Sequence, residues 1–144
     1  IFQSLLMKKM FLLLLVIILT ASCSQKITSE DMKFLNGYWE IEQVVFADGN
    51  HKDYKVNEII DFYEIKNDTG VRQKVKPQFD GSFVKGPIEE IKIEHLNEQV
   101  FIHYKTEFSE WKEHLIEIND QDFIVENEKK IQYKYKRHVP FSVK

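Results

Sequence analysis

The 144-residue sequence contains a single cysteine, Cys23, so no disulfide can form within the chain. It also has no phosphate-binding loop and no G-x-S-x-G elbow around a nucleophilic serine. No second cysteine is present to serve as a free nucleophile. These absences leave no motif that specifies a reaction. We therefore expect a protein that is not an enzyme, with no catalytic residues and no cofactor.

Metal ligands are poorly placed, although the chain has five histidines and many carboxylates. His51 and Asp53 fall in an expected loop, and His95 points away from its neighbour in an expected strand. His103 and His114 can meet across neighbouring strands, but two side chains make an incomplete ligand set. We interpret the histidines as solvated strand residues and expect no metal site.

Basic residues are in the minority, with 20 Lys and Arg against 23 Asp and Glu, for a net charge of −3. Lys8 and Lys9 precede Cys23, so a chain that begins at Cys23 carries a net charge of −5. A negative net charge argues against a nucleic-acid partner, because the phosphate backbone attracts basic surfaces.

A long apolar run occurs at residues 10–19, directly after Lys8 and Lys9 and just before the small residues that lead to Cys23. A basic start, an apolar core and a small-residue end are typical of a secretory signal peptide. The run is shorter than the roughly 20 apolar residues of a permanent membrane span. We interpret residues 1–22 as an upstream extension, which ends before Met7, plus a signal peptide.

The segment Leu19-Thr20-Ala21-Ser22-Cys23 resembles a bacterial lipobox, although Thr20 stands where Leu is usual. The resemblance implies that Cys23 is acylated and becomes the mature N-terminus, and that residues 23–31 form a lipidated tether. The alternative is a conventional signal peptide followed by a spare thiol. Residues 24–26 lack the early acidic cluster of some surface-export signals. We therefore expect an outer-membrane lipoprotein that faces the periplasm.

The remainder, residues 32–144, has strand patterns and no long helical pattern. Residues 37–45 place Trp39, Ile41, Gln43 and Val45 on one face, after a short helical turn at residues 31–35. Residues 131–137 place Tyr133, Tyr135 and Arg137 on one face. Further strand signals lie at residues 58–66, 71–75, 82–84, 88–95, 100–104, 111–118 and 123–125.

These short strands and tight turns predict one antiparallel all-β domain, an up-and-down β-barrel of about eight strands, with a two-sheet sandwich as the alternative. In residues 71–76, Val71, Gln73 and Val75 are predicted to point inward, so Arg72 and its basic neighbours should be solvated. The Gly86-Pro87 dipeptide should separate residues 82–84 from the next strand.

The tripeptide Gly37-Tyr38-Trp39 resembles the G-x-W signature of lipocalins, and Arg137 resembles the arginine that lies across that tryptophan at the closed end of their barrel. The resemblance, to short bacterial lipocalin-like lipoproteins, implies structural roles for Gly37, Trp39 and Arg137. The central lipocalin motif around Thr-Asp-Tyr is absent from this sequence.

Four polar side chains are predicted to point inward: Gln43, Gln73, Tyr104 and Tyr133. Inside a barrel they must pair with each other, with buried water or with a ligand. One hypothesis is a barrel that binds a small hydrophobic or amphipathic ligand in the cell envelope through these residues. The other is a filled barrel whose acidic surface, with Tyr38, Phe46 or Phe101, docks an envelope protein as an inhibitor or assembly factor.

Overall fold

The computed structural model describes residues 1–19 and 25–140, which form one α-helix, one 3-10 helix and nine strands. The helices are α1 (Phe2–Leu19) and η1 (Ser29–Leu35). The strands are β1 (Gly37–Val45), β2 (His51–Asp53), β3 (Ile60–Lys66), β4 (Thr69–Pro77), β5 (Phe83–Leu96), β6 (Gln99–Lys105), β7 (Glu110–Ile118), β8 (Asp122–Glu126) and β9 (Gln132–Arg137). In the described part of the chain, no helix has the length and apolar character needed to span a membrane.

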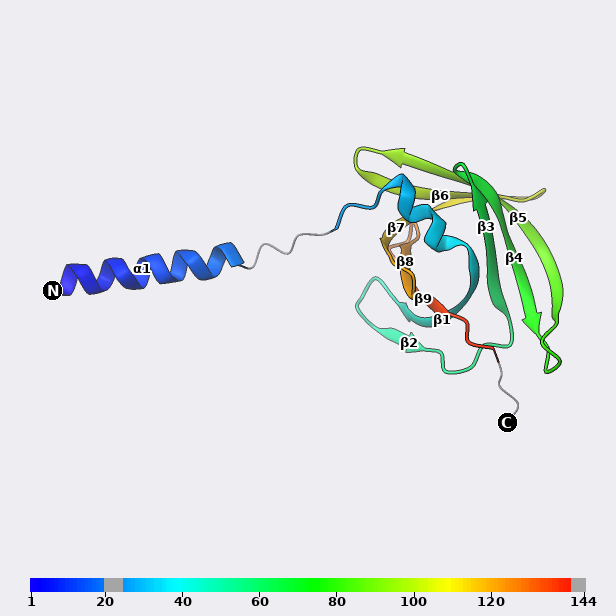
Figure 1. Cartoon of the computed structure of the whole chain (residues 1–144), viewed down its shortest axis with the longest axis horizontal. Helices are drawn as coiled ribbons and strands as arrows, with labels where there is room; N and C mark the ends of the chain where they lie inside the picture. The colour runs from blue at the N-terminus through cyan, green and yellow to red at the C-terminus, as the bar shows by residue number, and fades with distance from the viewer. Residues whose placement is uncertain (20–24, 141–144) are drawn as a thin grey trace.

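The strands form a closed antiparallel barrel (Figure 1). From β3 to β9 each strand pairs with the next, and β1 closes the barrel by pairing with both β3 and β9. The short β2 pairs only with the end of β1 and stands outside this ring of eight strands. The predicted up-and-down barrel is therefore confirmed, whereas the expected loop around His51 contains a short strand.

A β-bulge in β1 overturns one predicted face. Ile41 pairs with Tyr135, but the next paired residue, Gln43, faces Lys134, so the register shifts at Glu42. After this shift Val44, rather than Gln43, is buried. The prediction that Gln43 points inward was wrong, because a strict two-residue alternation assumes a strand without a bulge.

The face predicted for β4 was also wrong. Arg72 pairs with inward-facing Tyr63 and with Glu89, and it is only 7% exposed, whereas Gln73 lies on the opposite face. A second bulge, between Gln73 and Val75 in the β4 and β5 pairing, absorbs the Gly86-Pro87 dipeptide. Strand β5 therefore runs unbroken past that dipeptide, contrary to the expected break.

Helix η1 covers one end of the barrel and buries Met32 and Leu35 there (Figure 1). Its first turn is capped because the backbone N–H of Thr28 donates to the Asp31 carboxylate at 2.7 Å. Immediately after it, the Asn36 side chain donates to the carbonyl of Ile65 and accepts from the same residue's N–H. These two hydrogen bonds hold the residue that follows η1 against β3.

Trp39 and Arg137 close this end of the barrel, as the sequence predicted. The Trp39 side chain is fully buried and donates to the carbonyl of Leu35 at 2.7 Å. The Arg137 guanidinium lies 3.9 Å from the ring centre of Trp39 and donates to the carbonyls of Phe34, Asn36 and Asp120. It therefore ties the chain before β1 to the turn after β7 and to β9 itself.

Gly37 occupies a position where a residue with a side chain would be strained. Its φ of +116° is rarely adopted by residues with a side chain, and a Cβ there would lie 2.6 Å from Nη1 of Arg137. The glycine of the G-x-W tripeptide is thus needed for the close approach of the arginine.

Aromatic and branched side chains fill the covered half of the barrel. Phe123 is in edge contact with Trp39 and Tyr63 and stacks on Tyr135 with ring centres 4.5 Å apart. The surrounding buried residues are Ile65, Ile91, Ile93, Val100, Ile102, Leu115 and Val125. This half is a solid core.

Replacement of Arg137 by Ala should lower the free energy of unfolding by about 2–3 kcal/mol, because three carbonyls lose a charged donor and Trp39 loses its cation. Urea unfolding monitored by tryptophan fluorescence measures the loss. The control Lys136→Ala removes only a partly exposed ion pair to Glu40, at 3.4 Å, and should cost less than about 1 kcal/mol. Equal midpoints for Arg137→Ala and the original protein would contradict the structural role.

Candidate functional site

Charged side chains from four strands point into the uncovered half of the barrel. Asp61 comes from β3, Arg72 and Lys74 from β4, Glu89 from β5 and Glu113 from β7. Lys74 is 41% exposed, whereas the other four side chains are at most 15% exposed. Charges are rarely buried so deeply unless they are paired, so their contacts determine what this half of the barrel can do.

Arg72 lies at the centre of this cluster. Its Nε donates to the Glu89 carboxylate, and its Nη1 lies 3.6 Å from Oε1 of Glu113. The guanidinium also lies 4.2 Å from the ring centre of Tyr104 and 3.5 Å from the hydroxyl of Tyr63. These contacts compensate the burial of the positive charge.

Asp61 and Lys74 form a second ion pair beside the first. The Lys74 Nζ lies 2.5 Å from Oδ1 of Asp61, which is 3% exposed as a residue. Since the two residues face each other in the β3 and β4 register, the pair needs no backbone distortion.

Burial changes the protonation of this site. It raises the pKa of Glu113 above its usual value, while the charge of Arg72 and the hydroxyl of Tyr104 partly oppose the rise. Burial also raises the pKa of Tyr63 and Tyr104, so both hydroxyls remain protonated at neutral pH. They lie 3.1 Å apart and can donate hydrogen bonds.

A pocket of about 240 Å³ opens above this cluster, at the end of the barrel opposite Arg137. Its wall combines aromatic and aliphatic side chains with charged ones. The lining residues are Ile41, Arg72, Lys74, Trp111, Glu113, Asn127, Tyr133 and Tyr135. Trp111 stacks on Tyr104 at 5.3 Å between ring centres, which fixes the aromatic wall. The pocket therefore offers apolar faces next to buried charges.

Two of the four predicted ligand residues belong to the barrel interior. Tyr133 lines the pocket, and Tyr104 lies below it against Arg72. Gln43 and Gln73 do not: Gln43 donates to Asp53 at 2.7 Å, and Gln73 donates to the carbonyl of Gly86. Gln43 lies on the outer face because of the bulge in β1, and Gln73 lies there because β4 turns Arg72 rather than Gln73 to the interior.

Arg72, Glu113 and Trp111 were missed by the sequence prediction. Trp111, Glu113 and Leu115 alternate along β7, so this phase was available as a signal. Arg72 carried no such signal, because Val71 and Val75 made the opposite face of β4 look apolar. The sequence prediction therefore assigned a buried arginine to solvent.

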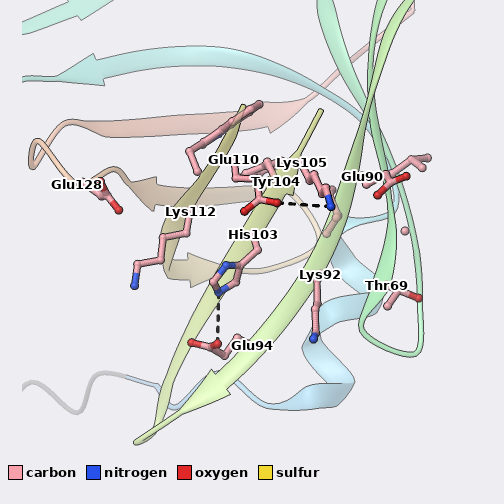
Figure 2. Close-up of a pocket in the computed structure, with 14 residues that line it drawn as sticks. Thr69, Glu90, Lys92, Glu94, His103, Tyr104, Lys105, Glu110, Lys112 and Glu128 are labelled. Atoms are coloured by element: carbon pink, nitrogen blue, oxygen red, sulfur yellow. Dashed lines mark ion pairs between the residues drawn. The ribbon is translucent and has the colours of Figure 1, made fainter. Parts of the chain in front are cut away.

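A second hollow, of about 830 Å³, lies on the outer face of β4 to β7 (Figure 2). Lys92, His103 and Lys112 face outward in one row across β5, β6 and β7. Acidic neighbours flank this row, and Glu94 lies 3.4 Å from the His103 ring. The charged side chains that line this hollow are of both signs, and most of them are exposed. Exposed charges interact with each other and with water, so they do not require a ligand.

The predicted docking residues are divided among separate places. Tyr38 stacks on Phe83 at 4.4 Å, Phe101 stacks on His114 at 5.0 Å, and Phe46 follows the far end of β1. These aromatic residues therefore do not combine into one docking patch.

Within residues 1–19 and 25–140 no group of three or more metal-ligating side chains occurs. Cys23 lies outside the described residues, so its lipidation stays a prediction.

The raised pKa of Glu113 predicts a pH-dependent difference in stability from Glu113→Gln. Below the unfolded pKa, near 4.5, both states are protonated and the carboxylate costs nothing. As the pH rises through the folded pKa, the original protein should lose stability relative to Glu113→Gln, by about 1.4 kcal/mol per unit of pKa difference. Urea unfolding of both proteins from pH 4 to pH 7 measures this, with exposed Glu128→Gln as the control. A relative gain of stability at pH 7 would contradict it.

Comparisons with known proteins give only distant structural similarities. No protein-family model matches the chain, and no curated protein matches it. The chain is similar to a lipocalin-like protein from Bacteroides uniformis, with a TM-score of 0.48 and 13% identity over 73% of this chain and 99% of that one. An uncharacterized protein from Bacteroides eggerthii gives a TM-score of 0.47 and 12% identity over 72% and 99% of the two chains. Apocrustacyanin C2 gives a TM-score of 0.46 and 12% identity over 80% of this chain and 67% of that one. All three identities are below 25% and all three TM-scores are below 0.5, and the closed eight-stranded barrel follows from the strand pairing of this chain itself.

Proposed function

We propose that the protein binds a small amphipathic molecule in the uncovered half of the barrel and that it does so as a lipoprotein of the cell envelope. The ligand-binding part of the proposal is supported by the pocket over Arg72 and Glu113, which combines aromatic walls with buried charge. Ligand sites in proteins have this composition, since apolar faces supply affinity and a few polar groups orient the ligand. An eight-stranded barrel is wide enough for one such molecule.

The volume of the pocket limits the ligand. About 240 Å³ is below the range of about 300–1,000 Å³ that is usual for drug-sized ligands. The half beneath η1 is already filled by side chains. The ligand is therefore a small molecule, or one end of a longer molecule whose remainder extends past the rim.

The second part rests on the signal-like start and the lipobox-like residues before Cys23. Residues 25–28 lead directly into η1, and Lys26 lies 3.1 Å from Glu98 in the turn after β5. A tether from Cys23 thus joins the barrel at its covered end. A pocket at the opposite end remains accessible when such a tether is anchored in a membrane.

Protein purified from its own envelope should carry a recurrent small molecule in native mass spectrometry. Tyr133→Ala should reduce its occupancy about tenfold or more, because the variant removes one wall of the pocket. Phe101→Ala, on the outer face, is the matched control and should retain the ligand. Ligand-free protein with a reproducible protein partner that Phe101→Ala loses would favour the docking hypothesis instead.

The mature N-terminus should be an acylated Cys23, and Cys23→Ala should release the barrel from the membrane fraction, because several acyl chains are needed for stable anchoring. Intact-mass analysis of protein extracted from membranes measures the modification. Cleavage at another residue, or an unmodified Cys23 thiol, would overturn the lipoprotein part and leave the ligand proposal standing.

A further inference from the structure

The charges inside the barrel do not balance. Asp61, Glu89 and Glu113 carry three negative charges, and Arg72 and Lys74 carry two positive ones, so the cluster has a formal charge of −1. Four of these five side chains are at least 85% buried, which makes an uncompensated charge costly. When all three carboxylates are ionised, the cluster lacks one cation.

Glu113 is the carboxylate whose partner cation lies farthest away. Glu89 accepts directly from Nε of Arg72, and Asp61 lies 2.5 Å from Nζ of Lys74. Glu113, in contrast, lies 3.6 Å from the guanidinium, which is longer than a direct hydrogen bond. Its side chain is only 8% exposed, yet it lines the pocket. Burial raises the pKa of this carboxyl even though the charge of Arg72 and the hydroxyl of Tyr104 oppose the rise.

The rest of the pocket also suits a cation. Trp111 and Tyr133 contribute aromatic surface on the apolar side, and Tyr135 lies beside them. Aromatic faces attract ammonium groups, most strongly where water is excluded. The barrel already uses this interaction, since Arg72 lies over the ring of Tyr104 at 4.2 Å.

An anionic ligand would be disfavoured at the same place. Arg72 and Lys74 are each engaged by a carboxylate, so an incoming anion must displace Glu89 or Asp61 or accept their repulsion. Displacement of one partner of a buried ion pair leaves an unpaired charge, which is strongly unfavourable.

We propose that the ligand carries a protonated amine, and that this ammonium group sits against Glu113 beside Trp111 and Tyr133, with its apolar part directed to the mouth of the barrel. The proposal deepens the ligand-binding function and depends on it. It defines the ligand class as small aliphatic or aromatic amines, and it excludes fatty acids and other carboxylates as the preferred ligands.

Three probes of equal chain length test the charge preference at pH 7 by isothermal titration calorimetry: octylamine, octanol and octanoate. The purified barrel should bind octylamine at least tenfold more tightly than either of the others. Glu113→Gln should lower the octylamine affinity at least tenfold and leave the octanol affinity unchanged. Glu94→Gln, which removes a carboxylate on the outer face, should leave all three affinities unchanged.

The outcomes separate this inference from the function on which it rests. Tighter binding of octanoate or octanol than of octylamine would overturn the amine class and keep the barrel as a binding protein. Absence of binding for all three probes would overturn both proposals. An octylamine affinity that is equal in Glu113→Gln and the original protein would also overturn the assignment to Glu113.

A second measurement keeps the test decisive when Glu113→Gln does not fold. In the original protein the octylamine affinity should fall as the pH is lowered through the pKa of Glu113, whereas the octanol affinity should not change. The charged groups that act on Glu113 are Arg72, Lys74 and Asp61, and the hydroxyl of Tyr104 hydrogen-bonds to it. Parallel pH profiles for the two probes would contradict the proposal.

Discussion

The closure of the barrel depends on the Arg137 guanidinium. It stacks on Trp39 and donates to three carbonyls, so one side chain joins η1, the turn after β7 and the two strands whose pairing completes the ring. Gly37 provides the space for this approach. Because a closed barrel has no edge strands, this junction replaces the edges that an open sheet would expose. The covered end is therefore a structural end.

The limited interior of an eight-stranded barrel explains why the other end differs. Large rings such as Trp39, Tyr63 and Phe123 fill the covered half without leaving room for a ligand. The uncovered half instead holds buried charges around Arg72 and a pocket lined by Trp111. The stabilising contacts and the proposed binding site thus lie at opposite ends of one short barrel, so a change at Arg137 is separable from a change at Glu113.

The most informative disagreement between sequence and structure concerns Arg72. Its neighbours Val71 and Val75 made the other face of β4 look like the core, but Arg72 is buried against Tyr104 and Glu89. A basic residue is interpreted as solvated unless its partners are known, and those partners come from strands that are distant in sequence. Glu113 was missed although its alternation with Trp111 and Leu115 along β7 indicated the inward face.

The sequence alone established the strand-rich domain and its antiparallel order, because local alternation and turn residues carry that information. The pair formed by Trp39 and Arg137 was expected from the resemblance of Gly37-Tyr38-Trp39 and Arg137 to the lipocalin pattern. Only the tertiary structure decided which side of each strand faces inward. The bulges in β1 and between β4 and β5 shift the register by one residue, and a shift of one residue exchanges the two faces. Gln43 was assigned to the interior for that reason, whereas Gln73 was assigned there because Val71 and Val75 made its face of β4 look apolar. The charged pocket exists because barrel closure brings side chains of β3, β4, β5 and β7 to one point, and no pattern within a single strand encodes that convergence.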